Sequence, residues 1–184
     1  MLQIIVEQND DLYDESRNEF VSCPECKLNL EHSLVSISKW ESKWHKPFLS
    51  GSKTNDKTNE ELLDYIRCMT VNTNKVDDIV YQCLSKENIR AIAEYIDDPM
   101  TATTIHKREN SRPNNEKLTS ELIYYWMIAY NIPFECQKWH INRLMTLIRV
   151  CDAKNAPSSK MTASDLASRN ALNAKRRAAM GTRG

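Results

Sequence analysis

The densest run of apolar residues lies at residues 118–150 and is interrupted once, by the sequence Asn-Ile-Pro that ends at Pro133. Before the interruption, apolar side chains recur every three or four residues, which places them on one side of an α-helix: Leu122, Tyr125, Trp126, Ala129 and Tyr130. After it, a second set has the same spacing: Cys136, Trp139, His140, Arg143, Leu144, Leu147 and Ile148. Thr119 or Ser120 is suited to cap the first helix, and the proline ends it because the residue before a proline is pushed out of the α region. The pattern predicts a helical hairpin at the centre of the core.

Helical spacing also appears earlier in the chain. We expect helices over residues 32–46, 59–71 and 85–96, and a short helix over 75–84. The first of these has one side that is apolar except for a single acidic residue: Leu34, Ile37, Trp40, Glu41 and Trp44. Residues 100–117 contain few apolar side chains, so we expect an exposed loop there.

The N-terminal residues have a different pattern. Residues 2–6 form a short apolar run, and residues 20–30 alternate in part between apolar and polar, as a half-buried strand does. We expect a small β element made by residues 2–7 and 19–31, in which Pro24 favours an edge strand or a turn. The fold class expected is therefore mostly α with a small N-terminal β element, followed by an extended basic C-terminal arm. The expected boundaries are a β element packed on the body at 1–31, a helical body at 32–152 and the arm at 153–184.

Charge and composition exclude several classes of function. The 25 basic and 25 acidic side chains cancel, so the chain as a whole is not an electrostatic binder of nucleic acid. With three glycines it is a poor candidate for a phosphate-cradling loop. No run approaches the ~20 apolar residues of a membrane helix, and the N-terminus lacks the pattern of a signal peptide. We therefore expect a cytoplasmic protein with no membrane contact and no cofactor. We also expect no enzymatic activity, because no nucleophile–base pattern is recognisable.

Charge is distributed unevenly along the chain. Residues 151–184 contain seven basic and two acidic side chains, a formal net charge of +5, and the remaining residues therefore carry about −5. The arm either docks on nucleic acid or on an acidic protein surface, of another subunit in an oligomer or of another protein, or it is a solvated tail. If it docks, the expected partner-binding residues are the basic side chains and one leucine: Arg169, Leu172, Lys175, Arg176, Arg177 and Arg183. A stripe of small residues is expected to allow close docking: Ala167, Ala171, Leu172, Ala174 and Ala178.

The cysteines raise the question of a metal site. Cys23 and Cys26 have the spacing of a zinc knuckle, but no second pair of this kind follows. Cys136 and His140 would share one side of a helix and would complete a site, and His32 is a further candidate ligand. The alternative is two reduced cysteines in a strand or turn, which we favour; serine at both positions 23 and 26 is then expected to leave folding unchanged.

The four tryptophans lie on apolar helical stripes, so core packing is a better interpretation than stacking on bases or sugars. We expect Trp126 and Trp139 to be buried against Trp40 or Trp44.

Four blocks of the sequence together resemble a family of tailed-phage proteins from the tail gene cluster, commonly labelled tail assembly chaperones: residues 30–49, 61–70, 121–157 and 168–184. The resemblance implies a non-enzymatic protein that binds other tail or virion components, the tape measure protein among them, in the host cytoplasm during assembly. One departure lies at Ser22–Cys26, where the family pattern is a strand without paired cysteines, and this further weakens the zinc interpretation. A structural component at the tail or the head–tail connector, which would be found in the virion, fits the basic arm equally well. A nucleic-acid-binding module that uses the arm is the other alternative.

Overall fold

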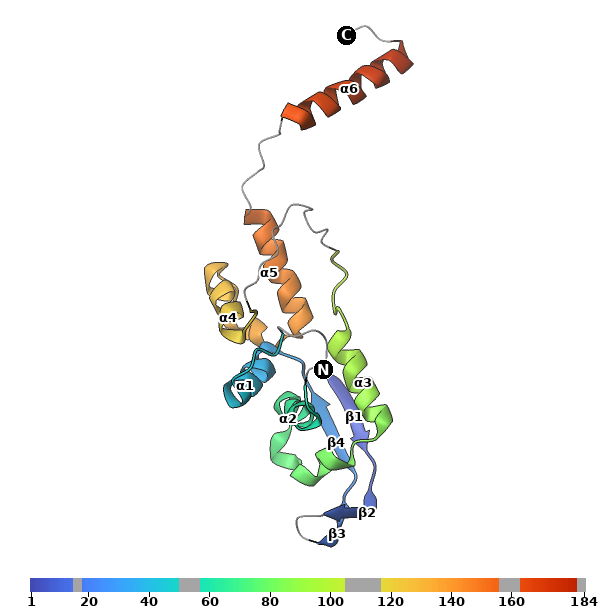
Figure 1. Ribbon diagram of the computed structural model, residues 1–184, viewed down its shortest axis with the longest axis vertical. Helices are drawn as coiled ribbons and strands as arrows, with labels where there is room; N and C mark the ends of the chain where they lie inside the picture. The colour runs from blue at the N-terminus through green and yellow to red at the C-terminus, as the bar shows by residue number, and fades with distance from the viewer. Residues whose placement is uncertain (15–17, 50–56, 105–116, 156–162, 182–184) are drawn as a thin grey trace. The chain divides into compact units, whose positions relative to one another are not determined.

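The computed structural model describes residues 1–14, 18–49, 57–104, 117–155 and 163–181 (Figure 1). The chain forms two units, Met1–Cys151 and Asp152–Gly184. The first unit is built mostly from helices with a small β element at its N-terminus, which confirms the expected fold class.

The β element consists of two antiparallel strand pairs. β1 (Leu2–Val6) pairs with β4 (Cys26–Leu30), and β2 (Asn9–Asp14) pairs with β3 (Glu19–Cys23). The strand expected over 19–31 is divided into β3 and β4, and Pro24 lies between them because proline cannot donate a ladder hydrogen bond. β2 was not expected, because its acidic composition is not typical of a strand. It forms by pairing with β3.

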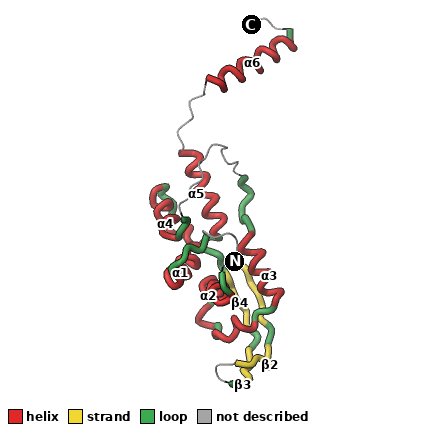
Figure 2. Tube along the Cα trace, viewed as in Figure 1, coloured by secondary structure: helices red, strands yellow, loops and turns green. Residues whose placement is uncertain are grey.

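The helices of the body begin at hydroxyl-bearing caps, as the sequence indicates. The side chains of Ser33, Thr58, Ser85 and Thr119 each accept a hydrogen bond from a backbone N–H in the first turn, which satisfies donors that have no partner within the helix. The elements in chain order are α1 (Leu34–Trp44), α2 (Asn59–Met69), the 3-10 helices η2 (Thr73–Lys75) and η3 (Asp78–Cys83), α3 (Lys86–Asp97), α4 (Ser120–Ala129), η4 (Phe134–Lys138) and α5 (Ile141–Asn155) (Figure 2).

The core is centred on α1, which packs against α2, α4 and η4. Trp40 is 1% exposed, and its indole N–H donates to the backbone carbonyl of Glu61 at 2.9 Å. Its ring lies 6.2 Å from the ring of Trp44 and 5.2 Å from that of Phe48, and Phe48 in turn stacks on Tyr65. These aromatic contacts join α1, α2 and the segment that follows α1.

Glu41 is the one acidic residue on the otherwise apolar side of α1, and it is buried there with hydrogen-bond partners. It is 8% exposed, and its carboxylate accepts hydrogen bonds from the backbone N–H groups of Phe48 and Ser120, both at 2.7 Å. Ser120 is the first residue of α4, so the carboxylate meets the positive end of that helix. Glu41 therefore connects α1 to α4.

The hairpin expected over 118–150 differs from the structure in its second half. The break at Pro133 is followed by the 3-10 helix η4, and α5 begins only at Ile141. Cys136 and His140 therefore do not share one α-helical face. At the other end, α5 continues to Asn155.

The burial of the hairpin also differs from the expectation. On α4 the buried residues are Ser120, Ile123 and Met127, whereas Tyr125 is 63% exposed. Trp126 and Trp139 are partly buried and pack against the core, whereas Trp40 is almost completely buried. The difference from the expectation arises because α4 is apolar on nearly every side, so spacing alone does not determine which side is buried.

None of the helices in the described ranges combines the length and the apolar character needed to cross a lipid bilayer.

Candidate functional site

The expected partner-binding residues lie on α6 (Ala163–Met180), the helix of the second unit. The residues from Arg169 to Arg177 named in the sequence analysis are all exposed, and Leu172 is 53% exposed. Arg183 lies outside the described residues.

Helical spacing divides α6 into two different sides. Arg169, Leu172 and Arg176 follow one another at intervals of three and four residues, so they share a side, and Lys175 lies next to them. The alanines recur with the same spacing but are offset by about 100–160° from Leu172: Ala167, Ala171, Ala174 and Ala178. Leu172 therefore belongs to the basic side of α6 rather than to the alanine stripe in which the sequence analysis placed it.

A second exposed surface lies on the body and was not expected. Tyr125 and Ile128 of α4 are 63% and 62% exposed, and Phe134 at the start of η4 is 54% exposed. Tyr124 donates a hydrogen bond to the side-chain oxygen of Gln137 at 3.0 Å, which holds η4 against α4. We call the surface formed by Tyr125, Ile128 and Phe134 the α4–η4 face.

Carboxylates flank the α4–η4 face along the chain. Glu121 is one turn before Tyr125 on α4, and Glu135 follows Phe134 in η4; both side chains are exposed. Within the part of the chain that the structure describes, neither glutamate forms a salt bridge. The face thus combines exposed apolar side chains with two flanking carboxylates, and η4 also carries the exposed Lys138. Apolar side chains beside carboxylates are suited to a basic, partly apolar helix.

The body also contains a buried polar network. His32 and Tyr65 are hydrogen-bonded through Nδ1 and the phenol oxygen, and the ring of His32 lies 5.0 Å from the ring of His140. His140 Nδ1 accepts from the backbone N–H of Asn142 at 3.3 Å, so its Nε2 donates to the carbonyl of Tyr95 at 2.9 Å. The network connects segments far apart in the sequence, and His32 is 2% exposed.

Burial keeps both histidines of this network neutral. It lowers the pKa of His32 to about 3, and the proximity of His140 lowers it further in the same direction. Burial also lowers the pKa of His140, although its hydrogen bond to the Tyr95 carbonyl opposes the shift. We interpret the pair as a structural element, since closed packing separates it from solvent.

The candidate zinc ligands are not brought together. Cys23 ends β3 and Cys26 begins β4, while Cys136 lies in η4. Both ring nitrogens of His140 already have hydrogen-bond partners, as described above. Burial and a hydrogen bond with the Cys83 thiol raise the pKa of Cys23 to about 12, which disfavours the thiolate that a metal requires. Among the described residues, no group of three or more His, Cys, Asp or Glu side chains is arranged to hold a metal ion.

The structure changes the expected effect of replacing the cysteine pair. Because Cys23 is fully buried, Cys23→Ser should lower the free energy of unfolding by about 1–3 kcal/mol through burial of a hydroxyl. Cys26→Ser, at a half-buried position, should change it less. Urea denaturation of the two single variants tests this difference. Equal losses, or stoichiometric zinc in the purified protein that either variant releases, would contradict the assignment of Cys23 to the core.

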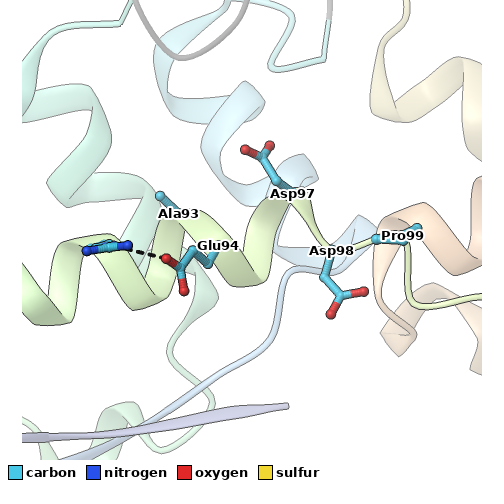
Figure 3. A pocket seen from close by; sticks show the side chains of 6 residues that line it. Ala93, Glu94, Asp97, Asp98 and Pro99 are labelled. Carbon is cyan, nitrogen blue, oxygen red and sulfur yellow. Dashed lines mark hydrogen bonds and ion pairs between the residues drawn. The ribbon is translucent and has the colours of Figure 1, made fainter.

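A shallow pocket lies along the end of α3 (Figure 3). Arg90 and Glu94 form an ion pair across one turn at 3.0 Å, and the backbone N–H of Met100 donates to Asp98 at 2.7 Å. The residues that line the pocket are acidic or small, apart from Arg90, and do not include a nucleophile paired with a base: Arg90, Ala93, Glu94, Asp97, Asp98 and Pro99. The pocket does not indicate a reaction.

Comparison of the chain with protein-family models, with curated proteins and with solved structures found no match.

Proposed function

We propose that this chain is a non-enzymatic protein of tailed-bacteriophage morphogenesis that binds other tail or virion proteins, in the manner of a tail assembly chaperone. It would act in the host cytoplasm during assembly, with the tape measure protein as a candidate partner. The sequence resemblance supplies the phage context.

The observation that carries the protein-binding part of the proposal is the exposed basic side of α6. An isolated helix obtains most of its stability from packing one of its sides, yet Leu166, Leu172 and Met180 of α6 are 45%, 53% and 76% exposed. Basic side chains surround Leu172, and Arg pairs with carboxylates through two parallel hydrogen bonds. Exposed ion pairs contribute less than about 1 kcal/mol each, so apolar contacts must supply the remainder of the binding free energy.

Removal of the arm tests the proposal. Deleting residues 158–184 should leave the melting temperature of the body nearly unchanged, because the body unit ends at Cys151. The same deletion should abolish capture of the tail protein that the full chain binds when the two are co-expressed. A matched variant with alanine at Lys175, Arg176 and Arg177 should weaken capture without abolishing it, since Leu172 remains. Unfolding of the deleted protein, or undiminished capture, would contradict the proposal.

Two alternatives are separated by further measurements. The cluster Lys175-Arg176-Arg177 is also suited to phosphate, and binding to nucleic acid would weaken steeply with salt, with a slope set by the number of phosphate contacts. A protein interface with an apolar centre should be less sensitive to salt. Mass spectrometry of purified virions distinguishes a structural component, which is present in the particle, from a chaperone, which is absent.

A further inference from the structure

The outer side of α4 requires an explanation. A helix that is apolar on all sides is normally buried on all sides, but only one side of α4 is covered by the body. Tyr125 and Ile128 are each more than half exposed on a helix that is otherwise packed through Ile123 and Met127, and Phe134 of η4 is more than half exposed as well. Large exposed apolar side chains that lie together on a folded body mark an interaction surface.

We propose that the α4–η4 face of one copy binds the basic side of α6 from a second copy of this chain. This inference rests on the proposed role of α6 as a docking helix and identifies the surface on which it docks. Charge complementarity favours α6 of a second copy as the binding partner of this face, since the segment 151–184 carries a formal charge of +5 and the rest of the chain about −5.

The two surfaces match in their order of side chains. On the α4–η4 face, apolar side chains lie between the carboxylates of Glu121 and Glu135. On α6, Leu172 lies between Arg169, one turn before it, and Lys175 with Arg176, one turn after it. Seven residues of helix extend about 10 Å, so Arg169 and Arg176 bracket Leu172 over that length on α6, and Glu121 precedes Ile128 by the same length on α4. In the proposed contact, Leu172 packs on the apolar side chains of the face, and the basic side chains pair with its glutamates.

The contact joins two different surfaces, and each copy carries both the α4–η4 face and the basic side of α6. If two copies bind each other's arms, they form a closed dimer. If each copy binds the arm of the next copy instead, the head-to-tail assembly grows until a ring closes. Either product is a self-assembled oligomer of the full chain without any other protein.

A charge exchange between full-length variants tests this proposal. Glu121→Lys with Glu135→Lys reverses the body surface, and Lys175→Glu with Arg176→Glu reverses the arm. Each variant alone should be monomeric in sedimentation velocity, because like charges then face each other. An equal mixture of the two should recover the oligomer, since the native arm of the first variant meets the native body of the second.

A matched control separates the contact from general charge effects. Glu60→Lys with Glu87→Lys makes the same charge change at exposed positions in the first turns of α2 and α3, and should assemble like the unmodified chain. Ile128→Ala should weaken assembly at unchanged charge. Circular dichroism of each variant verifies the fold.

The proposal is overturned if the unmodified chain is monomeric across the micromolar range, as it would be if α6 docked on its own body. It is also overturned if the mixture fails to recover the oligomer or if the control loses it. Either result would leave the proposed function intact where the arm deletion still abolishes capture of a tail protein. Conversely, recovery of the oligomer in the mixture of variants together with undiminished capture of the tail protein by the arm-deleted chain would support self-assembly and contradict the proposed function.

Discussion

Replacing Trp40 with alanine should lower the free energy of unfolding by about 3–5 kcal/mol, the range observed for large aromatic side chains removed from a core. Trp40 is 1% exposed, it donates to the Glu61 carbonyl, and it lies in contact with two other aromatic rings. The substitution leaves a cavity between α1 and α2 and an acceptor without its donor. Urea denaturation monitored by circular dichroism measures the loss.

Trp139→Ala is the matched comparison, since it removes the same side chain from a half-buried position. There the guanidinium of Arg143 lies over the indole ring at 4.3 Å, an arrangement typical of a surface cation–π pair. We expect a smaller loss than for Trp40→Ala, because part of this indole is already exposed to solvent. Equal losses for the two variants would show that the hairpin, and not α1, forms the centre of the core.

Mild acid should destabilise the body through His32 and His140. Both have a pKa below the ordinary value of the histidine side chain, which is about 6.5 when unfolded. Between that value and the lower folded pKa, the unfolded chain binds more protons, so the free energy of unfolding falls as the pH falls. For His32, whose folded pKa is about 3, the slope approaches about 1.4 kcal/mol per pH unit, and His140 adds a contribution of the same sign.

The window between about pH 6.5 and pH 5 isolates the histidines from the carboxylates. Glu61 and Asp64 also have lowered pKa values: for Glu61 the hydrogen bond from Lys46 is the main cause, and for Asp64 the hydrogen bonds from Lys43 and Trp44 exceed the opposing effect of burial. Their contribution is lost only as the pH falls below the ordinary carboxylate range, near pH 4.

Denaturation in urea at several pH values measures the acid dependence, and His32→Gln should reduce its slope between pH 6.5 and 5. The control is His45→Asn, at an exposed position with φ of 53°, because asparagine tolerates this backbone conformation. It should preserve the slope. A free energy of unfolding that is constant over this window in the unmodified chain would contradict the burial of the histidine pair.

The sequence by itself determined the positions of most helices in the body. Hydroxyl caps at Ser33, Thr58, Ser85 and Thr119 act on the backbone of the next turn, and Pro47 and Pro133 act on the residue before them, so these signals need no information about distant residues. The buried side of α1 followed from spacing because its other side is polar. The charge difference between body and arm was equally evident, since charge is a property of the residues alone.

Other features depend on the packing of the whole body. These are the buried side of α4, the hydrogen-bond partners of Glu41 and the separation of Cys136 from Cys23. Spacing selects a buried side only where one side is polar, and α4 has no such side. The strand β2 forms because β3 supplies its hydrogen bonds, a contribution that local composition does not reveal. The exposure of Tyr125, Ile128 and Phe134, which carries the proposed interface, likewise depends on how the body packs around Ile123 and Met127.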